Sequence, residues 1–219
     1  MASKAYLLAY NAAQTVAWSF VLYHVVTTML VQQGAAPTAF ARMGYVVWLA
    51  QNAAALEIVH AIVRLVPSPV GTTAMQVFSR LLLVNVVYFL PVAQQHWISQ
   101  VMFGAWALVE VVRYSYYATQ LVGAPIPAAF TWLRYSIFLF DYPLGVSGEL
   151  GTLYVSIDAI TAVHPALFYA TIAIMLSYVV GLPIMYSFML SQRRKYLGGA
   201  KGSAGTTAAG KAARTKKVE

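Results

Sequence analysis

Cysteine is absent from this chain of 219 residues, and charged side chains make up only 9% of it. Without cysteine the chain has no disulfide framework, no thiolate metal site and no cysteine nucleophile. Soluble domains carry about 25% charged residues, whereas 60% of this chain is hydrophobic. The composition therefore predicts an integral membrane protein.

Acidic residues are also scarce, because six Asp and Glu stand against fourteen Lys and Arg. Eight of the fourteen basic residues follow residue 190, so the net charge of +8 belongs mostly to the C-terminal tail. Nucleic-acid-binding proteins instead concentrate basic residues on a folded surface. The charge therefore predicts no nucleic-acid partner.

Long apolar runs predict an all-α bundle of six transmembrane helices. The first run is longer than the 7 to 15 apolar residues of a signal peptide and is interpreted as an uncleaved span. Prolines at 67 and 69 are expected to end the second span. The six spans cover about residues 8–31, 45–66, 74–93, 97–121, 128–155 and 165–190, each near the ~20 residues that a bilayer core requires.

The basic residues predict how this membrane domain, residues 1–197, is oriented. Short cytosolic loops retain Lys and Arg. Arg64 and Arg80 flank the second loop, and Arg113 and Arg134 flank the fourth. Both termini are therefore predicted to be cytosolic.

Residues 198–219 consist mainly of Gly, Ala, Ser, Thr and Lys, which predicts a disordered basic tail on the cytosolic side. Lys216 and Lys217 lie four and three positions from the end, a spacing typical of the dilysine signal that returns proteins to the endoplasmic reticulum membrane. The alternative is a tail held near anionic lipid headgroups.

The fifth run carries ionisable groups that a lipid-facing helix excludes, and such groups indicate a functional site. Tyr142 and Glu149 are seven residues and about 700° apart on a helix. An acid and a base would then face one interior cavity. Pro143 and Gly145 are expected to break or widen the helix there.

Other charged residues lie within the remaining spans. Glu57 and His60 have the Glu-x-x-His spacing of di-iron bundles, which need two such motifs and two further glutamates, so no metal site is predicted. His60 is expected to bond across helices instead. Gln76 and Arg80 lie four residues apart, and Glu110 and Arg113 lie three apart, so each pair is expected to point into the bundle. Structural support and substrate contact are both open for these four residues.

The sequence Tyr-Pro-x-Gly-Val-x-x-Glu at 142–149, preceded by Leu-Arg-Tyr, resembles the signature of the very-long-chain 3-hydroxyacyl-CoA dehydratases, once called protein tyrosine phosphatase-like. The resemblance places the family's catalytic pair on Tyr142 and Glu149, and Asp141 departs from the expected apolar residue. Further matching segments are 6–11, 56–60, 76–80 and 113–117. The residues expected to bind substrate or support the site are Glu57, Gln76, Arg80, Glu110, Arg113, Arg134 and Gly145.

The resemblance implies dehydration of a (3R)-3-hydroxyacyl-CoA to the trans-2-enoyl-CoA, the third step of very-long-chain fatty-acid elongation, with no cofactor. Glu149 is the better base and Tyr142 the better acid, although the reverse assignment is open. Arg134, with Arg80 or Arg113, is expected to hold CoA phosphates while the acyl chain enters an apolar tunnel. The expected partners are acyl-CoA, the lipid bilayer and enzymes of the elongation cycle. The alternative is a catalytically silent membrane adaptor of the elongase or secretory system.

Overall fold

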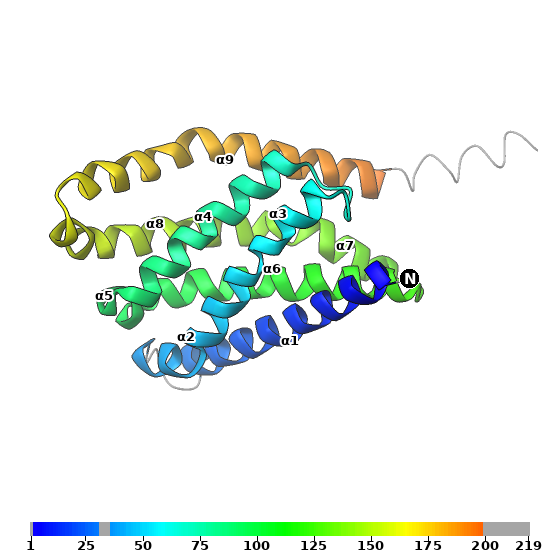
Figure 1. Cartoon of the computed structure of the whole chain (residues 1–219), viewed down its shortest axis with the longest axis horizontal. Coiled ribbons are helices and arrows are strands. Elements are labelled where there is room, and N and C mark those ends of the chain that lie inside the picture. Colours follow the sequence, from blue (N-terminus) through cyan, green and yellow to red (C-terminus); the bar gives the residue numbers. More distant parts are fainter. Residues whose placement is uncertain (1, 31–35, 199–219) are drawn as a thin grey trace, which may run out of the picture.

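The computed structural model describes residues 2–30 and 36–198, and every regular element within them is a helix (Figure 1). These helices form six long rods, because Ala54 alone separates α2 from α3 and Ile137 alone separates α7 from α8. The helices are α1 (Ala2–Leu30), α2 (Ala36–Ala53), α3 (Ala55–Ile62), α4 (Val70–Phe89), α5 (Pro91–Gln95), α6 (Trp97–Val122), α7 (Ala128–Ser136), α8 (Phe138–Val163) and α9 (Ala166–Gly198). The predicted all-α class is confirmed.

The helix ends follow from backbone chemistry. Gly123 closes α6 with a φ of 81°, a left-handed conformation that glycine adopts without steric cost. The second predicted span ends before its prolines, because Arg64 takes a φ of 56° after α3. The amide of Leu65 then donates to the His60 carbonyl at 2.8 Å, which completes a Schellman motif.

Three segments of the described chain are long and apolar enough to cross a membrane: Ala39–Ile62, Val70–Phe89 and Ala166–Gly198. They correspond to the second, third and sixth predicted spans. The rods α1, α6 and α7–α8 also exceed the ~20 residues that a bilayer requires. They carry buried polar side chains such as Gln14, Glu110 and Asp141, which lower their hydropathy.

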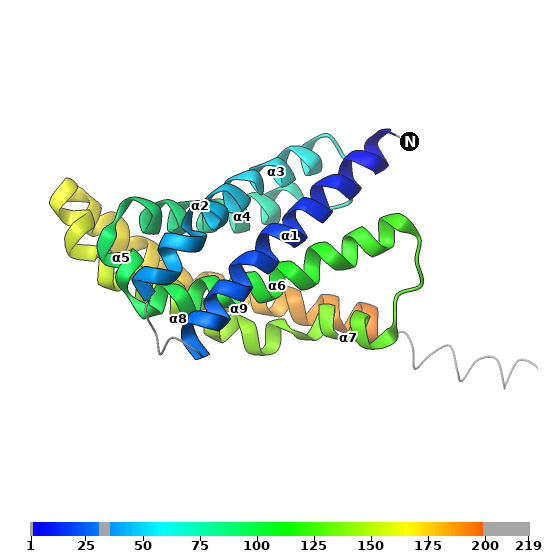
Figure 2. The same cartoon turned by 90° about the horizontal axis from the view of Figure 1, so that it is seen from below.

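The rods with buried polar side chains form the centre of the bundle. Helix α6 packs most extensively against α1 and α8 and lies between them (Figure 2). Trp18, Phe103, Trp106 and Leu153 are almost fully buried in this centre. Polar groups inside a membrane bundle are tolerated where neighbouring helices satisfy them, so the central position of these rods fits their composition.

Helices α6 and α8 approach each other closely at Gly148. A Cβ atom placed there would lie 2.7 Å from both the Cα and the backbone N of Met102. Only glycine permits this distance without moving one of the two helices. Small residues at helix crossings are a general device of membrane bundles.

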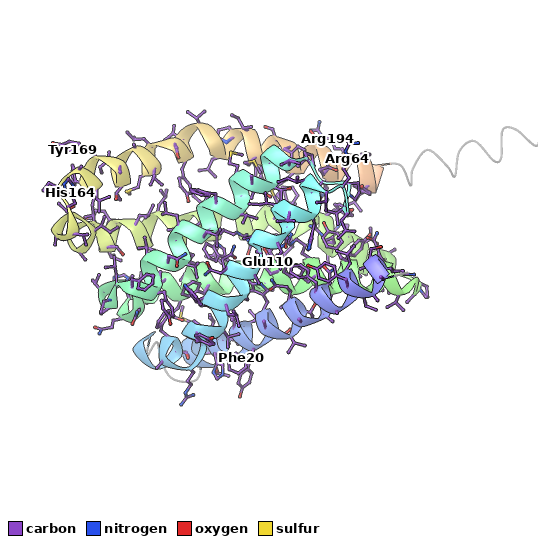
Figure 3. All side chains as sticks on the ribbon, in the orientation of Figure 1. Phe20, Arg64, Glu110, His164, Tyr169 and Arg194 are labelled. Carbon is purple, nitrogen blue, oxygen red and sulfur yellow. The ribbon has the colours of Figure 1, made fainter. Side chains whose placement is uncertain are left out.

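The described chain begins and ends at the same end of the bundle (Figure 1). The N-terminus, the α3–α4 connection with Arg64 and the end of α9 with Arg194 lie at one end (Figures 1 and 3). Helix α5 and the α8–α9 turn with His164 lie at the other end (Figures 1 and 3). Of the predicted tail 198–219, Gly198 is the last residue of α9, and the rest, with Lys216 and Lys217, lies outside the described residues.

Candidate active site

Tyr142 and Glu149 lie on the flank of α8 that faces α9. The buried face of α8, with Phe138, Asp141 and Gly148 among its residues, is a different one. The Tyr142 ring lies 5.7 Å from that of Tyr186 on α9, measured between centroids. Both rings line an open groove of about 420 Å³ between α8 and α9. The other lining residues are Pro143, Val146, Ser147, Leu182 and Pro183.

Glu149 lies two turns further along α8, about 10 Å at 1.5 Å per residue, and is not among the residues that line this groove. Its Oε1 accepts a hydrogen bond of 2.8 Å from Trp106 Nε1 on α6. Its Oε2 accepts one of 2.6 Å from the Tyr178 hydroxyl on α9. Two donors on two other helices therefore fix a carboxylate that still has free lone pairs.

The backbone around the pair differs from the expectation. Helix α8 continues through Pro143 and Gly145, and the interruption lies at Ile137, six residues before the proline. A Cβ atom on Gly145 would lie 3.7 Å from Ala105 Cβ, an ordinary contact. The predicted break at Pro143 is therefore wrong, because the neighbouring helix α6 packs along a continuous α8. The enclosed cavity expected there is, among the described residues, an open groove.

Four of the predicted charged residues form one cluster in the middle of the bundle, where Glu110 lies (Figure 3). Arg113 donates to both Glu57 oxygens, at 2.7 and 2.8 Å, and through Nε to Glu110 Oε2 at 2.6 Å. Arg80 Nη1 donates to the other Glu110 oxygen. Two arginines and two glutamates from α3, α4 and α6 thus neutralise one another, which is the usual state of charges inside a membrane.

The charge cluster leads to two corrections. Arg80 and Arg113 are committed to carboxylates, so they are not free to hold CoA phosphates as expected. Gln76 was expected to point into the bundle, but it is exposed. It lies in the first turns of α4, where all residues from 70 to 76 are exposed or half-exposed.

The cluster is linked to Glu149 through one side chain. The Arg80 guanidinium lies 5.2 Å from the centroid of the Trp106 ring, and the same indole donates to Glu149. A cation over an indole face is a favourable contact. The four charged residues therefore support the side chain that positions the candidate base.

Sequence reasoning missed the tyrosines and the tryptophan that complete these contacts. Trp106 and Tyr178 bind Glu149, and the hydroxyls of Tyr10 and Tyr114 donate to Glu57 Oε1. No local pattern marks these residues, because each contact crosses between helices far apart in the sequence.

The remaining predicted residues lie at other places. Asp141 is buried on α8, and its Oδ1 has no hydrogen-bond partner among the described residues. His60 Nε2 and the Tyr6 hydroxyl on α1 form a hydrogen bond of 2.9 Å, so His60 bonds across helices as expected. Within residues 2–30 and 36–198, no three His, Cys, Asp or Glu side chains come together as a metal site. Arg134 lies outside the charge cluster and donates to the Tyr117 hydroxyl at 3.0 Å.

The model of the family described as protein tyrosine phosphatase-like protein, PTPLA, matches residues 51–199. The chain belongs to this family. The PTPLA match includes Glu57, the charge cluster and the whole α8–α9 groove, and it confirms the resemblance in the sequence. Because the chain has no cysteine, the phosphatase in the family's description cannot be a cysteine-dependent activity here.

Curated relatives of this PTPLA chain carry the name very-long-chain (3R)-3-hydroxyacyl-CoA dehydratase. The hpo-8 protein of Caenorhabditis elegans is 39% identical, over 91% of this chain and 97% of its own length. PASTICCINO 2A of Oryza sativa is 34% identical, over 90% and 95%. Dehydratase 2 of Homo sapiens is 33% identical, over 89% and 82%. No solved structure matches the chain significantly.

Proposed function

We propose that this protein removes water from a (3R)-3-hydroxyacyl-CoA and releases the trans-2-enoyl-CoA, the third step of very-long-chain fatty-acid elongation. The observation that carries the proposal is the position of the Glu149 carboxylate. It lies on the same flank of α8 as Tyr142 and accepts hydrogen bonds from Trp106 on α6 and Tyr178 on α9. The names of the relatives supply the substrate class.

In this reaction Glu149 takes the proton from C2, next to the thioester carbonyl. The C2–H electron pair forms the C2–C3 double bond, and the C3–O bond breaks. Tyr142 gives its hydroxyl proton to the departing oxygen, so water leaves. Transfer of the C2 proton from Glu149 back to the Tyr142 phenolate restores the enzyme. General acid–base catalysis of this kind contributes typically about 10² to 10⁴ in rate.

The groove at Tyr142 suits the acyl part of the substrate. Most of its lining side chains are apolar, and it is open on the outside of the bundle between α8 and α9. An acyl chain can then lie along the groove and continue into the surrounding lipid. This replaces the closed tunnel as the path of the chain.

The six rods cross the bilayer of the endoplasmic reticulum with both termini in the cytosol. Two observations support this arrangement: each rod reaches the length of a span, and both described ends of the chain lie at the same end of the bundle (Figure 1). Lys216 and Lys217 serve as the retrieval signal, and enzymes of the elongation cycle are the partners.

The test is the conversion of a (3R)-3-hydroxyacyl-CoA by the purified full-length chain in detergent, with enoyl-CoA and water loss followed by mass spectrometry. The (3S) epimer is the control, and only the (3R) substrate should be converted. If folded protein forms no enoyl-CoA from either epimer, the hypothesis of a catalytically silent membrane adaptor replaces that of a dehydratase.

A further inference from the structure

A second group of cationic and aromatic side chains gathers where α7 meets the end of α9. The rings of Tyr135 and Tyr196 stack with centroids 4.3 Å apart and planes 10° apart. Arg193 Nε donates to Ser136 Oγ at 3.0 Å. The Arg134 guanidinium lies 5.5 Å from the Tyr135 ring centroid, and Lys195 Nζ lies 5.7 Å from that of Tyr196. We call Arg134, Arg193, Lys195 and Tyr196 the basic–aromatic cluster.

The charges of this cluster are not neutralised by the carboxylates of the described chain. All three ion pairs within residues 2–30 and 36–198 involve Arg80 or Arg113. Arg134 and Arg193 instead bind the hydroxyls of Tyr117 and Ser136. Arg134 Nε is buried and has no hydrogen-bond partner among the described residues. A guanidinium group that binds a hydroxyl and no carboxylate keeps its charge and further N–H donors for a phosphate, which guanidinium groups bind in bidentate geometry.

The basic–aromatic cluster and the candidate active site lie on one continuous seam between α7–α8 and α9. Successive contacts along it join Tyr135 to Tyr196, Ser136 to Arg193, Phe138 to Tyr186, Tyr142 to Tyr186 and Glu149 to Tyr178. Glu149 lies fifteen positions after Arg134, which corresponds to about 22 Å at ~1.5 Å per residue. A long, linear ligand can therefore touch both places at once.

We propose that the basic–aromatic cluster binds the 3′-phosphorylated adenosine diphosphate end of CoA, while the pantetheine arm follows the seam to Tyr142 and Glu149. Arg134 and Arg193 bind phosphate oxygens, and Lys195 adds a third cation. The half-exposed ring of Tyr196 offers a face on which adenine can stack, as aromatic side chains do for bases. This assignment rests on the proposed function, because the dehydratase reaction supplies the CoA ester.

Two features separate this site from simple anchoring of helix ends in the headgroup layer. Anchoring needs exposed cations on any helix end, whereas Arg134 and Arg193 are half-buried and aimed at neighbouring helices. Arg64 provides the comparison, because it is exposed at the same end of the bundle and outside the seam.

The experiment compares Arg134→Gln and Arg193→Gln with the control Arg64→Asn, all purified in a detergent without phosphate. Asparagine suits the left-handed conformation at residue 64. The substrates are one (3R)-3-hydroxyacyl group as its CoA ester and as its N-acetylcysteamine thioester.

Loss of a charge-assisted bond predicts that KM for the CoA ester rises about tenfold or more in the two test variants. With the truncated thioester KM should change less than twofold. In Arg64→Asn both values should match the wild type.

Binding of adenosine 3′,5′-bisphosphate, measured by calorimetry, tests the site without turnover. The wild type and Arg64→Asn should bind it, and Arg134→Gln and Arg193→Gln should bind it about tenfold more weakly. Equal KM changes for both substrates, or unchanged nucleotide binding, overturn the assignment. A KM effect that appears only after anionic lipid is restored would assign the cluster to lipid phosphates instead. If the wild type binds the nucleotide but dehydrates neither thioester, the proposed dehydratase function is wrong, while the basic–aromatic cluster remains a nucleotide-binding site.

Discussion

Glu149 and Asp158, two of the three carboxylates on α8, have opposite surroundings. The two oxygens of Glu149 are fixed by donors on α6 and α9, whereas the Asp158 side chain, nine residues later, is exposed. The residues that accept and donate protons must lie within reach of the substrate and keep a fixed orientation. Of these two side chains, only Glu149 meets this requirement.

We expect Glu149→Gln and Tyr142→Phe each to lower kcat by about 10² to 10⁴, because each removes one proton-transfer group. Enoyl-CoA formation by the purified variants measures the effect. Asp158→Asn and Tyr154→Phe are matched controls, since both remove the same chemical group from an exposed position on α8. Turnover close to the wild type in both test variants would remove the assigned pair from the mechanism.

Tyr178 is a positioning residue, because it acts on the substrate only through Glu149. Tyr178→Phe should lower kcat roughly tenfold and leave KM nearly unchanged, since one hydrogen bond of the carboxylate is lost while the groove is kept. Tyr169→Phe, at an exposed position of α9, should change neither constant. A variant in which KM rises and kcat is kept would show that Tyr178 binds substrate instead.

The residue scale also shows where prediction from sequence stops. The spacing of Tyr142 and Glu149 placed both on one flank of a helix. Arg80, Glu110 and Arg113 meet inside the bundle as expected, whereas Gln76 does not. Trp106 and Tyr178 could not be predicted, because their contacts depend on the register of α6 and α9 against α8. Neither residue has a local signal that separates it from an interfacial aromatic.

At the scale of elements, the crossing of α6 and α8 determines where Trp106 meets Glu149. Gly148→Ala should destabilise the protein by about 1–3 kcal/mol, because its Cβ would lie 2.7 Å from the Met102 backbone and force the helices apart. Thermal unfolding in detergent measures this loss. Gly181→Ala on α9 is the control, since nothing lies within 4 Å of its Cβ position. Equal stability of the two variants would contradict a close-packed crossing.

The ion pairs of the charge cluster join α3, α4 and α6. Glu110→Ala removes the acceptor of both Arg80 and Arg113 and should cost about 3–5 kcal/mol, as breaking a buried ion pair does. Asp158→Asn again serves as the control. Unfolding that starts at the same temperature in both variants would show that the cluster does not hold the helices together.

Element boundaries were predictable where the backbone signal was strong and not elsewhere. Gly123 ends α6 close to the predicted residue 121. The end of α3 was missed, because an arginine rather than a glycine takes the left-handed position at residue 64. The interruption at Ile137 was expected instead at Pro143. A single proline can be absorbed in a helix when tertiary packing holds both sides of it.

At the scale of the whole molecule, the distribution of charge predicts the orientation in the membrane. The start of α1 with Lys4, the α3–α4 connection with Arg64, α7 with Arg134 and the end of α9 with Arg193–Lys195 lie at one end of the bundle (Figure 1). Arg42 on α2 is the exception to this pattern. Short cytosolic loops retain such residues. The end with Arg194 should therefore face the cytosol, and the turn at His164 should face the lumen (Figure 3).

The absence of cysteine makes this orientation directly testable, because any introduced thiol is the only one in the protein. Arg194→Cys and His164→Cys both place it at an exposed position. In sealed microsomes with the cytosolic face outward, a membrane-impermeant maleimide should label the thiol at 194 and leave the one at 164 unlabelled. Detergent should then expose 164 to the reagent, and the wild type should stay unlabelled throughout. Labelling of both positions in intact microsomes would mean that the two ends of α9 lie on the same side of the membrane. Helix α9 would then not cross the membrane, although it is the most apolar of the three candidate spans.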